Sequence, residues 1–308
     1  MHRSLPAEPA PLALPPAPLA SPSRGTTTRR AVLLTAAILS ASAGAARGGT
    51  AAGSPMTVTV AGTGSAHGTM LRLGAALQRH NPLLAMRLLP NLVGTSGAIT
   101  AMLEGVVDVA IAGRPPNERE RAAGARSHAY ARTPFVFVAH PSVPVSAITL
   151  DDVVRIYAGT LQDWPDGKPI RLVRRPFNDS DIINLRAISP AMDRAVEASL
   201  RRPGLTTAAN DQDNAGALEA IPGSFGGFTL AQFQTDLPRL TLLTLDGVEP
   251  SPETLAAGRY PLAKTFYAVV PALPRPGAAR FLAFLAGPEA RAVLAGLGQT
   301  PVEWDGAA

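Results

Sequence analysis

The sequence has 308 residues, 46% of them hydrophobic and 17% charged, so the chain is long enough for two modest lobes or one large domain. It contains no cysteine, which excludes disulfide bonds, cysteine-ligated zinc, iron–sulfur clusters and a lipidated N-terminal cysteine. The net charge of +5 lies largely in residues 1–46 and is carried by arginine, so no basic surface for nucleic acid is indicated.

Residues 1–46 are interpreted as an export signal with a long, disordered leading segment. Residues 1–28 are rich in proline, alanine and serine without periodicity. Arg29-Arg30 then precede an apolar run to about Ala43, which is too short and too rich in alanine for a stable membrane span. The arginine pair resembles a twin-arginine signal, but the usual phenylalanine and trailing lysine are missing, so the ordinary secretory route stays open. We therefore expect a periplasmic protein that is processed near Ala43 or Ala46. The alternative is that the apolar run is a buried or amphipathic first helix of the fold.

From residue 56 to residue 112 the pattern alternates strand, helix, strand, helix, strand, which implies a parallel sheet with helices on its faces. The first strand leads into a loop, 62–68, that is rich in glycine and hydroxyl groups. A second such loop, 94–97, precedes a helix expected over 97–104 and an apolar strand over 107–112.

The rest of the chain continues the alternation. We predict a strand at 135–139 and a helix that begins after the Thr149 cap and ends at Gly159. A third loop, 174–181, follows a strand and precedes a helix. Residues 210–214 and 222–227 are expected to be loops. Strands at 240–245 and 265–270 and helices at 278–285 and 288–297 complete the expected fold.

Three loops between strand and helix indicate a single pocket. In an open parallel sheet such loops meet at the carboxyl ends of the strands. Free backbone N–H groups, hydroxyl donors and the positive ends of helix dipoles together favour an anion. The alternative is that Thr95 or Ser96 only caps its helix. Arg114 is either an anion ligand or the ion-pair partner of Glu118, and His67 is either a ligand contact or a solvated side chain.

The order of these motifs resembles the phosphate-type substrate-binding proteins of ABC transporters. The similarity covers residues 56–302. It is carried by Gly62-Thr63-Gly64-Ser65, Gly94-Thr95-Ser96-Gly97, Val107-Asp108-Val109-Ala110 with Arg114-Pro115, Ile156-Tyr157-Ala158-Gly159 with Trp164, Asp246 to Ser251, Gly258 to Leu262 and Phe281 to Leu285.

This resemblance implies a two-lobed α/β fold of the periplasmic type II binding-protein class. Each lobe would be a mainly parallel sheet flanked by helices, and two crossing strands, 136–139 and 266–270, would join the lobes. Lobe one would comprise 56–140 with 264–308, and lobe two 141–263. The anion would be held in the cleft between them.

The resemblance also implies the ligand donors. Backbone and hydroxyl groups would come from the first two loops, and an arginine with a serine would come from the third. The resulting candidates are Gly64, Ser65, Thr95, Ser96, Gly97, Arg174 or Arg175, and Ser180. Arg114, which follows the strand at 107–112, and Asp181, in the third loop, are further candidates.

Two departures from the family pattern bear on the ligand. Many members have Ser-Asp where this chain has Ala112-Gly113, and a carboxylate there can accept the proton of phosphate and so reject sulfate. In the third loop the family's Ser-Gly-Thr becomes Ser180-Asp181-Ile182. Asp179 or Asp181 could replace the missing carboxylate, and otherwise we expect poorer discrimination against sulfate.

The sequence thus predicts an exported, monomeric solute-binding protein for a small oxyanion, phosphate first, with an ABC permease as candidate partner. We expect neither catalysis nor a cofactor or metal. An exported dinucleotide-dependent oxidoreductase is an alternative, because 62–68 approaches the Rossmann fingerprint, although the spacing is one residue too long and no ribose-binding acid follows. A sensor that uses the binding fold without a transporter is another.

Overall fold

The computed structural model describes residues 54–90 and 93–304, so the predicted signal at 1–46 lies outside the described residues. The first half of the chain forms β1 (Met56–Gly62), η1 (Gly64–Ala66), α1 (His67–His80), β2 (Leu84–Leu88), α2 (Gly94–Leu103), β3 (Val109–Ala112), α3 (Glu118–Ala122), β4 (Ala125–Ala139), β5 (Ala147–Ile148) and α4 (Leu150–Ala158).

The second half of the chain contributes the remaining elements. It forms β6 (Arg171–Arg174), α5 (Ser180–Arg186), α6 (Pro190–Arg201), β7 (Thr206–Thr207), α7 (Asp211–Ala220), β8 (Ser224–Thr229), α8 (Leu230–Asp236), β9 (Thr241–Leu242), β10 (Thr244–Leu245), α9 (Pro252–Ala256), β11 (Ala263–Pro271), α10 (Pro276–Ala286), α11 (Pro288–Ala295) and β12 (Thr300–Pro301).

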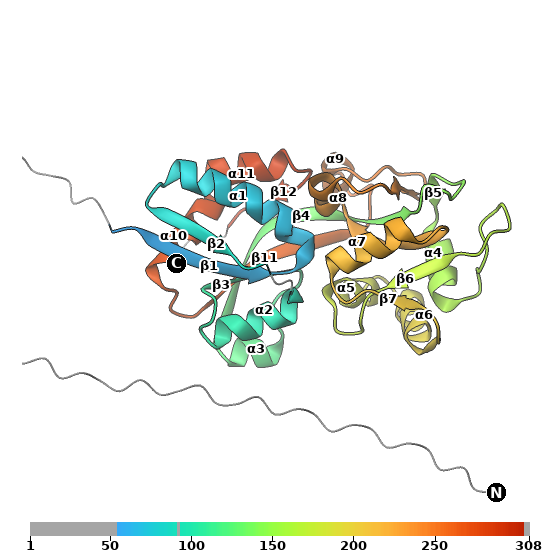
Figure 1. Ribbon diagram of the computed structural model, residues 1–308, viewed down its shortest axis with the longest axis horizontal. Helices are drawn as coiled ribbons and strands as arrows, with labels where there is room; N and C mark the ends of the chain where they lie inside the picture. Colours follow the sequence, from blue (N-terminus) through green and yellow to red (C-terminus); the bar gives the residue numbers. More distant parts are fainter. Residues whose placement is uncertain (1–53, 91–92, 305–308) are drawn as a thin grey trace, which may run out of the picture. The chain divides into compact units, whose positions relative to one another are not determined.

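The main sheet has the order β2-β1-β3-β11-β4-β8-β6-β7 (Figure 1). Strands β2, β1 and β3 are parallel to one another, and so are β8, β6 and β7. The two strands between these parallel sets, β11 and β4, are antiparallel to each other and to their outer neighbours. The expected mainly parallel α/β architecture is confirmed.

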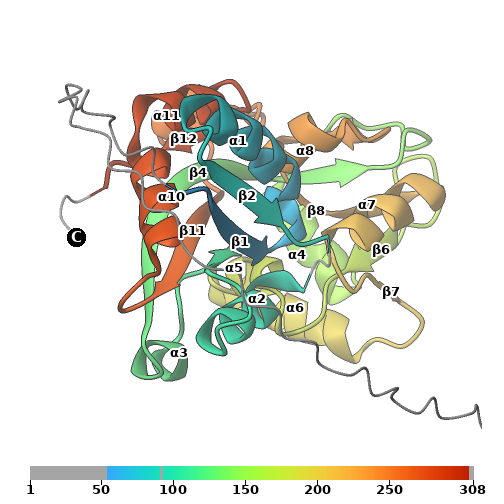
Figure 2. The same cartoon turned by 60° about the vertical axis from the view of Figure 1, so that its left-hand side comes forward.

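We call lobe one the part built around β1, β2 and β3, whose sheet is covered on both faces. Val58 and Val60 point into a core formed with α1, α10 and α11, whereas Ala61 points to the opposite face, where α2 packs. Figure 2 shows the sheet between these helix layers. Burial on both faces explains why these strands are nearly continuous apolar runs in the sequence.

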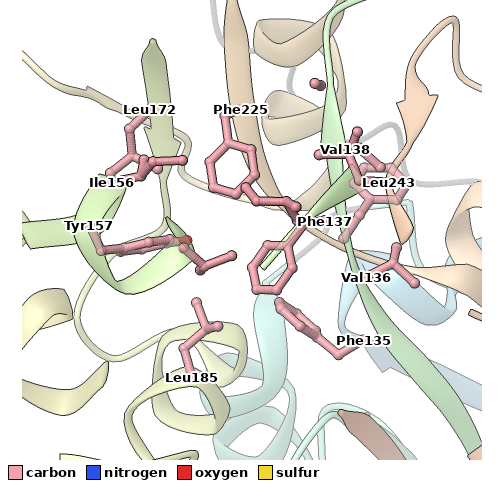
Figure 3. Packing of buried hydrophobic residues seen from close by; sticks show 14 of the residues in the cluster. Phe135, Val136, Phe137, Val138, Ile156, Tyr157, Leu172, Leu185, Phe225 and Leu243 are labelled. Carbon is pink, nitrogen blue, oxygen red and sulfur yellow. The ribbon is translucent and has the colours of Figure 1, made fainter. Parts of the chain in front are cut away.

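We call lobe two the part built around β8 and β6, with a single large core. It contains Phe137 stacked on Phe225, with ring centroids 5.6 Å apart, and Tyr157 from α4 (Figure 3). At about 25 cal/mol per Å² of buried apolar surface, burial of each such aromatic side chain stabilises the fold by several kcal/mol.

The chain crosses between the cores on β4 and β11. Ala131 belongs to the core of lobe one and Phe135 to that of lobe two, while Leu262 belongs to lobe two and Phe266 to lobe one. The crossings therefore lie at 131–135 and 262–266, a few residues before the stretches predicted. The prediction also missed the first ten residues of β4. Polar residues interrupt the apolar pattern there, but β11 pairs with this part of the strand from Ala125 to Pro134.

The prediction of a flexible loop at 222–227 was wrong. Residues Ser224–Thr229 form β8, which is buried at every position in the centre of the sheet. A Cβ added at Gly227 would lie 2.6 Å from the ring of Phe135, so glycine serves close packing there. A glycine-rich segment can therefore be a core strand.

Candidate functional site

The loop after β1 lies directly against lobe two. The carbonyl oxygen of Gly64 accepts a hydrogen bond from Nε2 of Gln212 (3.3 Å), and the Thr63 hydroxyl donates to the carboxylate of Asp211 (3.1 Å). A Cβ added at Gly64 would lie 2.3 Å from Oε1 of Gln212. The absence of a side chain at Gly64 therefore lets the two lobes meet at this loop.

A buried lysine lies behind this loop. Lys264, near the start of β11, donates a hydrogen bond to Oγ of Ser65 (3.0 Å) and forms an ion pair with Asp181 at the start of α5. The exposed fractions of the two charged side chains are 0% and 4%. Lys264 was missed in the sequence because a lysine in a strand is usually a surface residue. Only its position between apolar neighbours hinted at burial.

The loop between β6 and α5 supplies a second buried cation. Arg175 donates hydrogen bonds to the carbonyl oxygen of Ala208 (3.0 Å) and to the carboxylate of Asp179 (2.8 Å), and its guanidinium lies 3.8 Å from the carboxylate of Asp211. Asp179 also caps α5 by accepting from the backbone N–H of Asp181 (2.8 Å). Arg175, rather than Arg174, is the arginine that joins the buried network.

The second predicted loop differs from the expectation, because residues 94–97 form the first turn of α2. Oγ1 of Thr95 accepts a hydrogen bond from the backbone N–H of Gly113 (2.8 Å), which ties α2 to the end of β3. Gly97 contacts the side chain of Val93 rather than any of the buried charges: a Cβ there would lie 3.0 Å from the Cβ of Val93. Of this turn, Thr95 lies at the edge of the site, next to Gly113.

Ser96 and Arg114 form a separate cluster at the rim. The guanidinium of Arg114 donates to Oγ of Ser96 (2.9 Å) and pairs with both carboxylate oxygens of Glu120 (2.7 and 2.9 Å). The partner expected for Arg114 was Glu118, so that alternative was wrong in its residue. The true partner follows from the capping box of α3, in which Asn117 and Glu120 bond reciprocally and aim the carboxylate at Arg114.

Gly113 lies where lobe one meets Lys264 and α5. A Cβ at this position would lie 2.5 Å from Cε of Lys264 and 2.8 Å from Oγ of Ser180. The carbonyl oxygen of Gly113 accepts a hydrogen bond from Asn184 of α5 (3.4 Å). The absence of a side chain at Gly113 thus provides the space that the side chain of Lys264 fills.

Residues 210–214 were expected to be a plain surface loop, and this was wrong. Asn210 caps α7, which begins at Asp211, and both Asp211 and Asn214 are buried. Asp211 therefore lies in the charged network, whereas Asp213 is exposed and accepts a hydrogen bond from the side chain of Asn210 (2.8 Å). The sequence did offer a signal for a helix, because asparagine is a common capping residue. In the structure its side chain accepts a hydrogen bond from the backbone N–H of Asp213, three positions later.

The buried charges perturb one another strongly. Burial raises the pKa of the Asp181 carboxyl to about 6, and the carboxylates of Asp179 and Asp211 act in the same direction against the opposing effect of Lys264. Burial by itself would lower the pKa of Lys264 and of Arg175, but the surrounding carboxylates outweigh it and raise both. Two cations and three carboxylates share this site, which leaves one negative charge in excess.

Several polar atoms of this region lack a hydrogen-bond partner among the described residues. They are Nε of Arg175, Nη1 of Arg174, Oε1 of Gln212 and Oδ1 of Asn214. Buried polar groups are normally paired, and an unpaired one costs about 1–3 kcal/mol. Such a concentration next to buried charges is typical of a site that receives a ligand.

The predicted residues therefore divide into two groups. The structure brings Gly64, Ser65, Arg175, Ser180 and Asp181 together where the lobes meet, with Thr95 at the edge. Ser96, Gly97 and Arg114 lie outside this network. The site also contains side chains that were not predicted: Thr63, Asp211, Gln212, Asn214 and Lys264.

Two α/β lobes that share a buried polar site at their junction define a two-lobed ligand-binding protein. The family model described as PBP superfamily domain matches residues 40–289, which is most of the chain. The chain belongs to this family, as the sequence predicted from its resemblance to type II binding proteins.

Sequence relatives and a solved structure agree with this assignment. The phosphate-binding proteins PstS of Borreliella burgdorferi and Bacillus subtilis are 21% and 24% identical over 57% and 67% of this chain. The matches span 65% and 67% of those relatives, about two thirds of their length. A putative phosphate ABC transporter substrate-binding protein from Clostridium perfringens, solved with bound phosphate, has 20% identity and a TM-score of 0.70, and covers 80% of this chain and 100% of its own.

In residues 54–90 and 93–304 no group of three or more His, Asp or Glu side chains is placed to hold a metal ion. None of the helices in this part of the chain is long and apolar enough to cross a bilayer.

Proposed function

We propose that this chain is the exported solute-binding component of an ABC transporter and binds a small tetrahedral oxyanion, phosphate first, without chemistry. The ligand would lie between lobe one, residues 56–140 with 264–308, and lobe two, residues 141–263. A permease would receive the anion from a monomeric binding protein. The named relatives support phosphate, because both are phosphate-binding proteins.

One observation carries the proposal: cations and hydroxyl donors from both lobes meet in a buried site. Lobe one contributes Ser65 and Thr63, β11 contributes Lys264, and lobe two contributes Arg175. Ammonium, guanidinium and hydroxyl groups are the donors that bind oxyanions most strongly, and charge-assisted hydrogen bonds contribute about 1.5–3 kcal/mol each. Donors on separate lobes would couple anion binding to closure.

Calorimetric titration with phosphate, sulfate, molybdate and tungstate tests the proposed ligand. Arg175→Lys keeps the positive charge but removes the planar fork, and it should weaken binding by roughly tenfold to a hundredfold. Arg201→Lys is the matched control, because Arg201 is 77% exposed and pairs with Glu197 on the same helix. Failure of all four anions to bind the wild-type protein would exclude the proposal.

Export and cleavage are tested separately. The proposed signal peptide at 1–46 would be removed near Ala43 or Ala46, and N-terminal sequencing of exported protein would detect an intact Met1 if this is incorrect. Replacement of Arg29 and Arg30 by lysine distinguishes the routes, since export through the twin-arginine pathway should stop and export through the ordinary secretory pathway should continue.

A further inference from the structure

The side chains around Lys264 form a closed set. Its ammonium contacts Oγ of Ser65 from lobe one and the carboxylate of Asp181 from lobe two. Its stem fills the space above Gly113, where a Cβ would lie 2.5 Å from Cε. The ring of Phe266, 5.8 Å away, covers another side of the ammonium. Lys264 is therefore held at the point where the lobes meet and is shielded from solvent.

The carboxylate of Asp181 already supplies Lys264 with an anion. It lies at the first turn of α5, beside the predicted donor Ser180, and its charged partner comes from the other side of the junction. A carboxylate and a tetrahedral oxyanion present similar negative oxygens to an ammonium group. An incoming oxyanion would therefore compete with Asp181 for the same cation.

We propose that Lys264 is the principal anion-binding cation of this site and that Asp181 is an internal competitor, so that an oxyanion binds only as Asp181 releases Lys264 and takes up a proton. This inference rests on the function proposed above and deepens it. It makes Lys264 and Asp181 the residues that set specificity. The exchange involves a single proton: an O–H bond forms at a carboxylate oxygen of Asp181, and the proton comes from solvent or, when the ligand is the phosphate monoanion, from the ligand, which becomes the dianion.

The charges that face Asp181 explain why a proton must accompany the anion. Lys264 of β11 and Arg175 of the preceding loop are positive, whereas Asp179 before α5 and Asp211 of α7 are negative, and Tyr157 of α4 is also near enough to interact. With one negative charge already in excess, a dianion would leave three in a site shielded from water. Protonation of Asp181 removes one of these charges and frees Lys264.

The proton is accessible near neutral pH. Burial raises the pKa of Asp181 to about 6, so its carboxyl takes up a proton far more readily near neutral pH than an exposed aspartate does. The competing group thus has a proton affinity suited to a ligand-linked exchange.

The mechanism predicts how the site discriminates between anions. Phosphate carries a proton near neutral pH and can share it with the Asp181 carboxylate in a hydrogen bond, whereas fully ionised sulfate has no proton to share and Asp181 must take one from solvent. Phosphate is therefore favoured over sulfate, although Gly113 offers no carboxylate. Asp181 performs this discrimination from the other lobe.

Calorimetry with sulfate and phosphate at pH 5.5, 7.0 and 8.5, in two buffers of different ionisation enthalpy, tests the inference. Wild-type protein should take up close to one proton per sulfate above pH 7, and its sulfate affinity should fall about tenfold per pH unit there. Asp181→Asn should remove the proton uptake and bind sulfate at least tenfold more tightly at pH 8.5. Asp193→Asn is the control, because Asp193 is half-exposed and pairs with Arg186 at the surface.

Lys264→Met should lose both anions at every pH, and Lys264→Arg should retain binding because it keeps the charge. A thermal melt of each variant shows whether it is folded. If Lys264→Met does not fold, the anion affinities of Lys264→Arg are compared with those of the wild type instead. Two results would overturn this inference and leave the proposed function intact. One is that the wild type binds phosphate while sulfate binding is unchanged in Asp181→Asn. The other is that Lys264→Met binds the anions as the wild type does. If no oxyanion binds to the wild-type protein at any pH, the proposed function fails and the inference fails with it.

Discussion

The ion pair between Lys264 and Asp181 gives the sharpest prediction for stability. Lys264→Met keeps an unbranched apolar side chain close in length to the lysine stem and lacks the ammonium. Because the two charged side chains are 0% and 4% exposed, the variant leaves a buried carboxylate without its partner, which typically costs 3–5 kcal/mol. We expect the free energy of unfolding to fall by about 4 kcal/mol at pH 8.

Charge counting around the pair predicts the other variants of a double-mutant cycle. Asp181→Asn leaves Lys264 and Arg175 facing Asp179 and Asp211, a balanced set, and the asparagine resembles the protonated carboxyl that the raised pKa of Asp181 favours. This variant should therefore be at least as stable as the wild type at pH 8. Lys264→Met/Asp181→Asn should be more stable than the sum of the two single effects predicts, with a coupling energy of at least 1 kcal/mol.

The loss in Lys264→Met should depend on pH. Burial raises the pKa of Asp181 even with Lys264 present, and without Lys264 the carboxyl should be protonated more readily. At pH 5 the buried group is then neutral, so the loss should shrink by at least half. Urea unfolding at pH 5 and pH 8, followed by fluorescence, measures both values. A loss below about 1 kcal/mol at pH 8, or equal losses at the two pH values, would refute this account.

Three further outcomes are expected. Gly113→Ala should lower the free energy of unfolding by about 1–3 kcal/mol, because its Cβ would lie 2.5 Å from Lys264, whereas Gly216→Ala in open space on α7 should stabilise by about 0.5–1 kcal/mol; equal effects in urea unfolding would contradict the packing. Trp164→Phe removes a buried 3.0 Å hydrogen bond to a backbone carbonyl and should cost about 1 kcal/mol or more in thermal unfolding; an unchanged Tm would count against it. Because burial raises the pKa of Asp181 from 3.8 to about 6, wild-type stability should fall by about 2 kcal/mol as the pH rises from 4 to above 7, and Asp181→Asn should lack this fall.

The sequence was sufficient where structure is set by neighbouring residues. The apolar runs of β1 and β3 and the Thr149 cap of α4 each predicted an element that the structure contains. The same local reasoning failed at β8, because glycine is frequent both in loops and in strands that pack closely. It also failed at α7, whose polar first turn faces buried charges that are distant in the sequence.

The site was predicted in part for a related reason. Glycine and hydroxyl loops can be recognised locally, and Ser65 and Ser180 do reach the junction of the lobes. Lys264 could not be found in this way, since its partners Ser65 and Asp181 are 199 and 83 positions away. A contact over such a distance is set by the crossing of β11 between the lobes and has no local pattern.

The two departures from the family pattern, at Gly113 and at Asp181, can be explained together as changes that compensate for one another. Asp181 adds a carboxylate to lobe two, and a buried carboxylate without a partner would destabilise the closed lobes. Lys264 supplies that partner, and its side chain needs the space that Gly113 leaves free. Restoring an acid at 113 would therefore clash with Lys264 and add to the negative charge already in excess. The three residues depend on one another, because a side chain at 113 would displace Lys264 and loss of the Lys264 ammonium would leave Asp181 buried without a partner.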